Sequence, residues 1–359
     1  MNILEKYGID ERFLQEATLY PELVIARISS QYKDLYKAVT SQVEIYAEIS
    51  GKIRYAALSL SDYPAVGDYV MLDRGDNKRG NAIIHHVLTR KSSFERRAAG
   101  TENNIQVVAA NIDIVFICMA LNNDFNLRRL ERYLSIAWNS RAIPVVVLTK
   151  SDICSDLEDK LAKVSSVAIG VDVLVTSAMS GDGYDSIKSY IKPGKTVAFI
   201  GSSGVGKSTL INRLAGEEIL PTNEIDKNEK GRHTTTRRQL LFLQNGGIVI
   251  DTPGMRELGI DSVNLSKAFV DIDDLAKNCK FNDCSHQSEP GCAVQKAIQT
   301  GQLTEERLAS YLKLKKEAKY DGLNFKQIEN EKINAMFSGM GGMKNARNFI
   351  KSQTRNKRI

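Results

Sequence analysis

The sequence predicts a multidomain α/β protein, in which a mostly parallel sheet with helices on both faces follows a small β-barrel and precedes a mostly helical segment. Three observations lead to this fold class. Short apolar segments separated by turn residues fill the first part of the chain, strand-like and helix-like segments alternate in the middle, and helical spacing returns near the end. With 359 residues, the chain is long enough for two or three domains.

The composition is that of an ordinary globular protein, with 42% hydrophobic and 26% charged residues, which excludes wholesale disorder. The N-terminus lacks the apolar core of a signal peptide, and no apolar run approaches the roughly 20 residues that span a bilayer. Five cysteines are too few, and odd in number, for a disulfide framework. We therefore expect a soluble, cytoplasmic protein with no membrane partner. The net charge of +6 favours a polyanionic partner.

Residues 1–20 are predicted to form a short helical lead-in, and residues 21–95 a barrel. Five or six short strands are expected in the barrel, separated by turns such as Ser50-Gly51. The candidate strands are Val24–Ile28, Tyr36–Thr40, Val43–Ile49, Lys52–Leu58, Val66–Leu72 and Asn81–Val87. Strands of this length in about 70 residues indicate a small antiparallel barrel, of which the OB-fold is one common form.

Residues 96–262 alternate between strand-like and helix-like segments, which predicts a mostly parallel sheet covered by helices on both faces. The apolar run Val107–Leu121 suits a strand buried on both faces. The other expected strands are Ile143–Leu148, Val171–Val175, Thr196–Ile200, Gln239–Leu243 and Gly247–Ile250, and the expected helices are Leu127–Ser140, Ser155–Val164 and Tyr184–Tyr190. Residues 263–330 are predicted to be mostly helical, and residues 331–359 to form a basic, flexible tail.

The strongest local motif has the pattern G-x4-G-K-S of a phosphate-binding loop: Gly201-Ser202-Ser203-Gly204-Val205-Gly206-Lys207-Ser208. It follows an expected strand and opens an expected helix, which is the context that the motif requires. The glycines allow backbone N–H groups to turn toward phosphate oxygens, and the helix N-terminus adds positive potential. Lys207 would reach the β- and γ-phosphates, and the Ser208 hydroxyl would bind Mg²⁺. The alternative is a glycine-rich turn without a ligand.

A second motif, Thr149-Lys150-Ser151-Asp152, follows a buried strand and selects the base. The Asp152 carboxylate can accept hydrogen bonds from N1–H and the 2-amino group of guanine, whereas adenine presents neither donor there. Lys150 can lay its aliphatic stem along the base. Ser177-Ala178 follows the next strand and is placed to donate a backbone N–H to guanine O6. Because these segments end strands of one sheet, they point to a common guanine-nucleotide site.

Two further segments resemble nucleotide switches. Asp251-Thr252-Pro253-Gly254 has the pattern D-x-x-G, in which Asp251 would hold Mg²⁺ through water and the Gly254 N–H would contact the γ-phosphate. The long polar segment Thr222–Thr236 is predicted to be a first switch, in which Thr234 or Thr235 binds Mg²⁺. The alternative for its threonines is the start of a strand rich in β-branched residues.

The order of these motifs differs from that of an ordinary small GTPase, in which the phosphate loop comes first and the guanine motif late. Here the guanine motif (149–152) and its companion (177–178) precede the phosphate loop (201–208), which precedes the switches (233–236 and 251–254). Cutting a compact domain at its surface and rejoining its nearby termini preserves such a site. The sequence therefore resembles a circularly permuted GTPase. Met255 follows Gly254, where Ras-like GTPases carry a glutamine that orients water. A thioether cannot do so, and His233 is the nearest candidate to position the attacking water; the alternative is a surface histidine in a loop.

Three of the five cysteines and one histidine gather within 14 residues: Cys279, Cys284, His286 and Cys292. A Cys₃His set closes a tetrahedral shell around a structural zinc ion and leaves no open position for catalysis. The alternative is a group of incidental free thiols. Cys118 lies in an apolar strand and is expected in the core, and Cys154 has no assigned role.

In combination, the barrel, the permuted motifs and the Cys-Cys-His-Cys cluster resemble the small-ribosomal-subunit-dependent GTPase A family of bacteria, RsgA, over roughly residues 21–320. The resemblance implies an OB-fold, a C-terminal zinc domain, and GTP hydrolysis to GDP that the small ribosomal subunit stimulates during its late maturation. By motif, it implies that Thr149–Asp152 and Gly201–Thr209 bind GTP and that the four Cys and His residues bind zinc. It also implies 16S rRNA as a partner, and we expect a monomer.

One residue departs from the usual guanine motif, because Thr149 stands where GTPases commonly carry asparagine. Threonine lacks the amide that tethers the phosphate loop, so we expect a modest nucleotide affinity. Two rival functions remain open. One is an ATP-dependent kinase or transferase that uses the same loop, which the base preference set by Asp152 would distinguish. The other is a non-catalytic module with GTP as a structural ligand, which multiple-turnover hydrolysis would distinguish.

Overall fold

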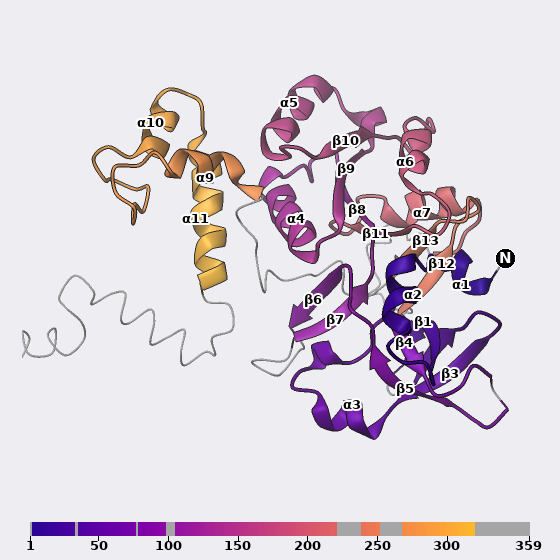
Figure 1. The fold of residues 1–359 in the computed structure, drawn as a ribbon. Coiled ribbons are helices and arrows are strands. Elements are labelled where there is room, and N and C mark those ends of the chain that lie inside the picture. Colours follow the sequence, from indigo (N-terminus) through magenta and orange to yellow (C-terminus); the bar gives the residue numbers. More distant parts are fainter. Residues whose placement is uncertain are drawn as a thin grey trace, which may run out of the picture.

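One continuous sheet of eleven strands joins the N-terminal barrel to the α/β part of the chain (Figure 1). The computed structural model describes residues 2–32, 35–76, 78–97, 105–220, 238–251 and 268–319. Strand β12 (Arg238–Phe242) pairs with β1 (Val24–Gln31) of the barrel through Ser30 and Gln31. The strands of the α/β part therefore continue the hydrogen-bonded sheet of the barrel.

The barrel closes as the sequence predicts. Its strands are β1, β2 (Tyr36–Val39), β3 (Glu44–Ile49), β5 (Ala82–Val87) and β4 (Tyr69–Leu72), in that spatial order, and β4 pairs back to β1. The β3–β5 pair is parallel and the other pairs are antiparallel. Alternate apolar side chains of these strands fill one core, among them Ala26, Ile28, Ile45 and Ile84. This is a five-stranded, OB-like barrel.

The strand expected over Lys52–Leu58 is wrong, because residues Gly51–Ala56 form helix α3, and a short 3₁₀ helix, η1, follows at Leu60–Asp62. Ser50 caps α3: its hydroxyl accepts a hydrogen bond of 3.2 Å from the Ile53 N–H. Tyr55 and Leu58 are 95% and 96% exposed. A barrel strand would bury every second side chain, so this segment connects β3 to β4 outside the barrel wall.

The α/β part has five parallel strands in the order β10-β9-β8-β11-β13, with β12 antiparallel at the end of this set. The strands are β8 (Ile114–Ala120), β9 (Ile143–Thr149), β10 (Asp172–Val175), β11 (Thr196–Ile200) and β13 (Ile248–Asp251). The helices are α4 (Leu127–Ser140), η2 (Ser151–Ile153), α5 (Leu157–Val167), α6 (Tyr184–Tyr190) and α7 (Lys207–Ala215).

Helices cover both faces of this sheet, which confirms the predicted layers. Alternate residues of β8 face opposite sides. Val115 and Ile117 belong to the core beneath α4 and α5, whereas Phe116 and Cys118 belong to the core beneath α6 and α7. Since both faces of β8 are buried, the strand is apolar throughout. Burial raises the pKa of the Cys118 thiol to about 12, as expected for a core cysteine.

The apolar run Val107–Leu121 is two strands rather than one. β7 (Ile105–Ala110) pairs with β6 (Ser93–Arg97) in a separate hairpin, and β8 begins four residues after β7 ends. Asn111 separates β7 from β8, with φ of 56° in the left-handed region that asparagine tolerates. Its side chain bonds to the Lys91 N–H at 2.9 Å and to the Gly67 carbonyl at 3.0 Å. Apolar composition alone did not reveal this turn.

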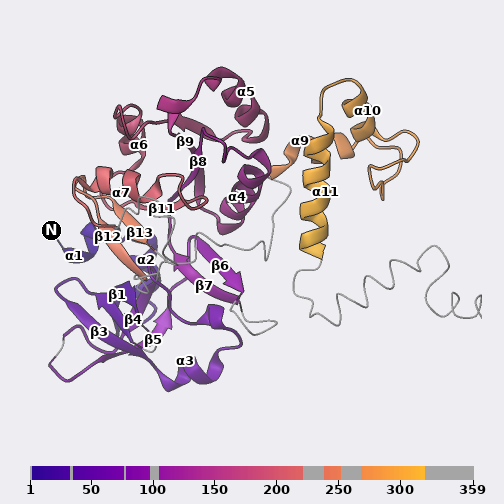
Figure 2. The ribbon, with the colours of Figure 1, turned by 180° about the vertical axis from the view of Figure 1, so that it is seen from behind.

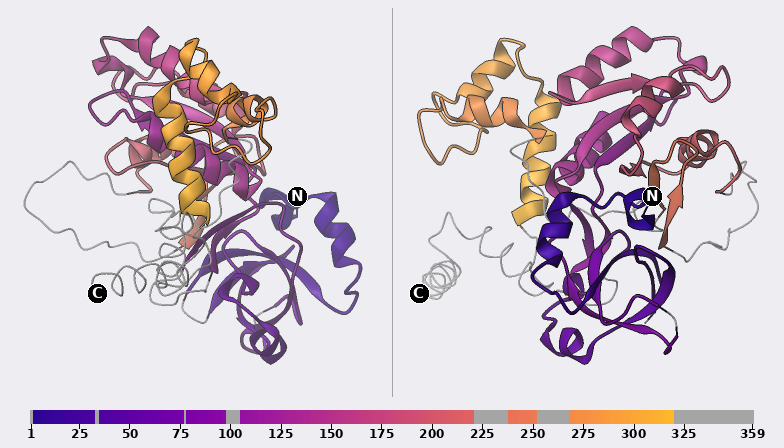
Figure 3. Two further views of the ribbon diagram at one scale, coloured as in Figure 1. Left: turned by 90° about the vertical axis from the view of Figure 1, so that its left-hand side faces the viewer. Right: turned by 45° about the vertical axis from the view of Figure 1, so that its right-hand side comes forward.

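The N-terminal lead-in is helical, as expected, and lies where the barrel meets the α/β part (Figure 3). It consists of α1 (Ile3–Lys6) and α2 (Glu11–Ala17). The buried side chain of Arg27 crosses this junction and donates to the carbonyl of Tyr7, to the carbonyl of Gly67 at 3.2 Å and to the Thr196 hydroxyl at 2.9 Å. Lead-in, barrel and sheet are thus tied by one side chain.

The C-terminal described residues form three helices beside α4 (Figures 1 and 2): α9 (Val270–Ala276), α10 (Ala293–Gln299) and α11 (Glu305–Lys319). Arg307 of α11 is 6% exposed and donates to Glu131 of α4 at 2.7 Å and to Asp271 of α9 at 2.6 Å. This ion cluster joins the helical segment to the sheet domain. Over the described part of the chain, no helix has both the length and the apolar character needed to cross a membrane.

Candidate functional site

The predicted phosphate loop lies between β11, which ends at Ile200, and α7, which begins at Lys207. Gly201 has φ of 146°, and a Cβ there would lie 2.3 Å from the carbonyl oxygen of Cys118, so only glycine fits. Gly206, with φ of 96°, precedes the first turn of α7. The Lys207 ammonium folds back over the loop and donates to the carbonyls of Gly201 at 2.7 Å and Ser202 at 2.6 Å. The expected strand–loop–helix arrangement is therefore confirmed.

The guanine motif lies beside this loop, because Thr149 ends β9 at the same edge of the sheet. The Thr149 hydroxyl donates to the carbonyl of Val205 in the phosphate loop at 2.6 Å. The prediction that this position loses the tether to the phosphate loop is therefore wrong. The Thr149 hydroxyl forms the hydrogen bond that an asparagine would form with its amide. Lys150 follows with φ of 61° and turns the chain into η2, which contains Ser151 and Asp152.

The structure also brings Asp152 and Ser177 together from the segments that follow the neighbouring strands β9 and β10. The Ser177 hydroxyl donates to a carboxylate oxygen of Asp152 at 2.5 Å and accepts the Met179 N–H at 3.1 Å. Ser177 is fully buried, and its own N–H donates to the carbonyl of Asp182 at 3.2 Å. The serine thus fixes the orientation of the carboxylate that the sequence assigns to base recognition.

Two side chains beside the phosphate loop, Arg129 and Asp124, were not predicted, and both contact the predicted loop residue Ser202. Arg129, in the first turn of α4, donates through one nitrogen to both carboxylate oxygens of Asp124, at 2.7 and 2.8 Å, and to the Ser202 hydroxyl at 2.8 Å. Ser202 in turn donates to Asp124 at 2.6 Å. These hydrogen bonds from Arg129 and then Ser202 lower the pKa of Asp124. One signal was available: Asp124 follows β8 at the edge where the other motifs lie.

Several predicted site residues lie outside the described residues. They are His233, Thr234, Thr235 and Gly254. Asp251 is the last residue of β13, which is parallel to and paired with β11, so its backbone lies next to the strand that leads into the phosphate loop. Ser208 and Thr209 lie in the first turn of α7, directly after Lys207.

The four predicted metal ligands converge between α9 and α10. Their ligand atoms all lie within 4.8 Å of one another. The Cys279 and Cys292 sulfurs are 3.9 Å apart, and His286 Nδ1 is 3.7 Å from the first and 3.6 Å from the second. Ligands bound at about 2.3 Å around a tetrahedral Zn²⁺ would lie about 3.8 Å apart, so the donor set fits zinc. Burial, with Lys315 nearby, lowers the pKa of His286 and favours its neutral, metal-binding form.

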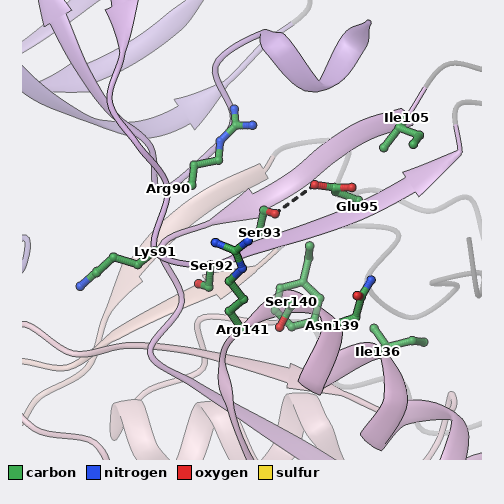
Figure 4. A pocket seen from close by; sticks show the side chains of 11 residues that line it. Arg90, Lys91, Ser92, Ser93, Glu95, Ile105, Ile136, Asn139, Ser140 and Arg141 are labelled. Atoms are coloured by element: carbon green, nitrogen blue, oxygen red, sulfur yellow. Dashed lines mark hydrogen bonds between the residues drawn. The ribbon is translucent and has the colours of Figure 1, made fainter. Parts of the chain in front are cut away.

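A cavity of about 380 Å³ lies elsewhere, between residues 90–95 and the C-terminal end of α4 (Figure 4). Arg90, Lys91 and Arg141 line it, together with polar side chains such as Ser93. Arg90 forms an ion pair with the buried Asp68 at 2.7 Å. None of the predicted nucleotide or metal residues lines this cavity. It is therefore separate from the nucleotide site.

A parallel sheet that carries the guanine motif on an earlier strand than the phosphate loop defines this chain as a circularly permuted P-loop GTPase. The sequence model of the family described as "RsgA GTPase" matches residues 87–261. A "Small ribosomal subunit biogenesis GTPase RsgA 2" from Lactiplantibacillus plantarum is 49% identical over 342 residues, which cover 95% of this chain and 96% of that protein. The chain belongs to the RsgA family.

More distant relatives agree with this assignment. A protein named "Small ribosomal subunit biogenesis GTPase RsgA" from Methanosarcina acetivorans is 42% identical over 92% of this chain and 90% of its own length. Among solved structures, YjeQ from Thermotoga maritima superposes with a TM-score of 0.61 at 28% identity, covering 82% of this chain and 98% of that one. YloQ, described as a circularly permuted GTPase, gives 0.59 at 25% identity, covering 83% and 95%.

Proposed function

We propose that this chain is a GTPase of small ribosomal subunit biogenesis: it binds the subunit late in maturation, and the subunit stimulates its hydrolysis of GTP to GDP and phosphate. The observation that carries the proposal is the convergence of the phosphate loop with Asp152 and Ser177 at one edge of the sheet. The names of its relatives support the ribosomal role. The γ-phosphate would order the switches and stabilise the subunit-binding conformation, and its loss would weaken binding.

Each nucleotide contact is assigned to a residue of the site. Asp152 recognises N1–H and the 2-amino group of guanine, and Lys150 covers the base. Because the Ser177 N–H is engaged by Asp182, we assign the contact with guanine O6 to the Ala178 N–H. The phosphates are bound by Gly201, Ser202, Ser203, Gly204, Val205, Gly206, Lys207, Ser208 and Thr209. Thr149 and Ser151 hold this arrangement in place.

The hydrolytic residues belong to the switches and the first turn of α7. Ser208 and Thr235 would hold Mg²⁺ with GTP, and Asp251 would bind it through water. Bound there, Mg²⁺ would neutralise charge that develops between the β- and γ-phosphates. Gly254 and Thr234 would contact the γ-phosphate region, and His233 would position the attacking water in the absence of a glutamine at Met255.

The Cys₃His cluster is assigned to a structural zinc ion, held by Cys279, Cys284, His286 and Cys292. All four positions of the tetrahedral shell come from the protein, so the ion would cross-link the chain rather than bind a substrate. This zinc would hold the end of α9 against the start of α10.

We infer that the subunit is recognised mainly through 16S rRNA. The net charge of +6 and the OB-like barrel suit structured RNA, through phosphate contacts and shape more than base recognition. A monomer suffices, because the guanine motif and the phosphate loop come from one chain. The proposed partner implies a cytoplasmic location.

Exchanging Asp152 for asparagine tests the nucleotide site. In Asp152→Asn, an NH₂ group replaces one carboxylate oxygen. This donor would face the 2-amino group of guanine, which is also a donor, but it can donate a hydrogen bond to the 2-oxo group of xanthine. We expect GTP affinity to fall roughly 100-fold, since two hydrogen bonds to a charged group are lost, and affinity for xanthosine triphosphate to rise. Isothermal titration of both nucleotides measures this. Asp156→Asn, which removes a nearby carboxylate paired with Lys160, is the control; an unchanged GTP affinity in Asp152→Asn would refute the assignment.

A further inference from the structure

We propose that Arg129 is a positioning residue for the terminal phosphate of GTP, acting through Ser202 and cancelling the charge of Asp124. The inference rests on the proposed function, because it assigns a new role within the same nucleotide site. It concerns a cluster that joins the first turn of α4 to a phosphate loop 73 residues away in the sequence.

Helix α4 fixes where the Arg129 side chain lies. The Asn126 side chain caps the helix and accepts the Arg129 N–H at 3.0 Å. Side chains of a helix lean toward its N-terminus, which directs Arg129 back over the loop that follows β8. Its guanidinium meets Asp124 of that loop at 2.7 Å and the Ser202 hydroxyl at 2.8 Å. A guanidinium in the first turn of a capped helix is thus held against the phosphate loop.

Ser202 links this cluster to the lysine of the phosphate loop. Its carbonyl accepts a hydrogen bond of 2.6 Å from the Lys207 ammonium, while its hydroxyl contacts both Arg129 and Asp124. In a phosphate loop this lysine reaches the β- and γ-phosphates. Arg129 therefore orients the residue whose backbone positions the lysine that contacts the terminal phosphates.

The charge balance predicts which nucleotide depends on Arg129. Asp124 places a carboxylate beside the loop that must hold a polyanion, and its lowered pKa keeps it ionised at neutral pH. Arg129 cancels that charge through two contacts, at 2.7 and 2.8 Å. Without Arg129, the uncompensated carboxylate of Asp124 would repel both nucleotides. It would repel GTP more strongly than GDP, because GTP carries the additional negative charge of the γ-phosphate. A purely structural contact would instead affect both nucleotides equally.

The test compares GDP with a non-hydrolysable GTP analogue on the full-length protein. In Arg129→Ala we expect affinity for the GTP analogue to fall about tenfold, the size of one lost hydrogen bond to a charged group, with GDP affinity within about twofold of the original protein. The KM for GTP should rise with it. Arg129→Lys, which keeps the charge, should recover part of the loss. So should Asp124→Ala combined with Arg129→Ala, which removes both charges. Arg128→Ala, an exposed arginine in the same turn, is the matched control.

Equal losses for GDP and the GTP analogue in Arg129→Ala would overturn the proposal, as would affinities equal to those of Arg128→Ala. If the double variant bound the GTP analogue no better than Arg129→Ala, charge cancellation would be wrong. Failure of the unsubstituted protein to bind either guanine nucleotide would instead refute the proposed function, and this inference with it. Thermal melting of each variant separates these results from misfolding.

Discussion

Replacing Cys292 by serine is expected to release the metal and unfold the segment between residues 268 and 319. Cys292 is both a member of the Cys₃His cluster and the N-cap of α10, where its sulfur accepts the Gln295 N–H at 3.4 Å. Serine is a good N-cap, so this substitution preserves the cap and removes only the metal ligand. Buried side chains of this segment, such as Phe269, Val294 and Leu308, pack in the same core as α4. Structural zinc contributes about 10–16 kcal/mol in comparable small sites, so we expect its loss to outweigh that packing.

Metal content and hydrogen exchange measure this outcome. The original protein should carry one zinc per chain, and chelation should raise exchange in α9, α10 and α11 while the barrel stays protected. Cys154→Ser is the matched control, because Cys154 is a cysteine outside the cluster. Unchanged exchange in the three helices after loss of the metal would contradict a structural role for the site.

Replacing Arg307 by methionine should lower the free energy of unfolding by about 3–5 kcal/mol, the usual cost of leaving a buried charge without its partner. Glu131 is 3% exposed, and it accepts hydrogen bonds from Arg307 at 2.7 Å and from the Ser310 hydroxyl. Methionine keeps most of the arginine's apolar volume, so the loss would report the charge rather than a cavity. Urea unfolding measures the difference.

The pH dependence of this loss provides a second readout. Burial raises the pKa of Glu131, and Arg307 opposes that shift. A carboxyl whose pKa is higher in the folded than in the unfolded protein contributes stability at low pH that is lost as pH rises. Removing Arg307 should raise this pKa further, so Arg307→Met should cost more stability at pH 8 than at pH 5. Adding Glu131→Gln should recover much of the loss at pH 8; no recovery would contradict the ion-pair account.

The sequence predicted elements whose signals are local. Residues 127–140 and 184–190 have helical spacing and form helices with these bounds, and the Cys₃His ligands were found because 14 residues contain them all. The segment that forms helix α3 was predicted to be a strand because Ser50-Gly51 was interpreted as a turn between strands, whereas Ser50 caps the helix. The turn at Asn111 was missed because apolar residues continue on both sides of it.

Contacts between distant segments could not be predicted. The Thr149 hydroxyl reaches a carbonyl 56 residues away, and Arg307 reaches Glu131 across 176 residues. Neither separation corresponds to a helix or strand period, because only the folded chain brings the two residues of each pair together. The sequence could therefore name the nucleotide motifs but could not show that threonine serves as a tether or that Arg129 joins the phosphate loop.

GTP hydrolysis measured with and without purified small ribosomal subunits tests the central claim most directly. Large subunits and ATP serve as controls for the partner and the nucleotide. The account predicts slow turnover of GTP alone, strong stimulation by small subunits only, and no comparable turnover of ATP. Slow GTP turnover that neither subunit changes would contradict the ribosomal role and leave only the GTPase.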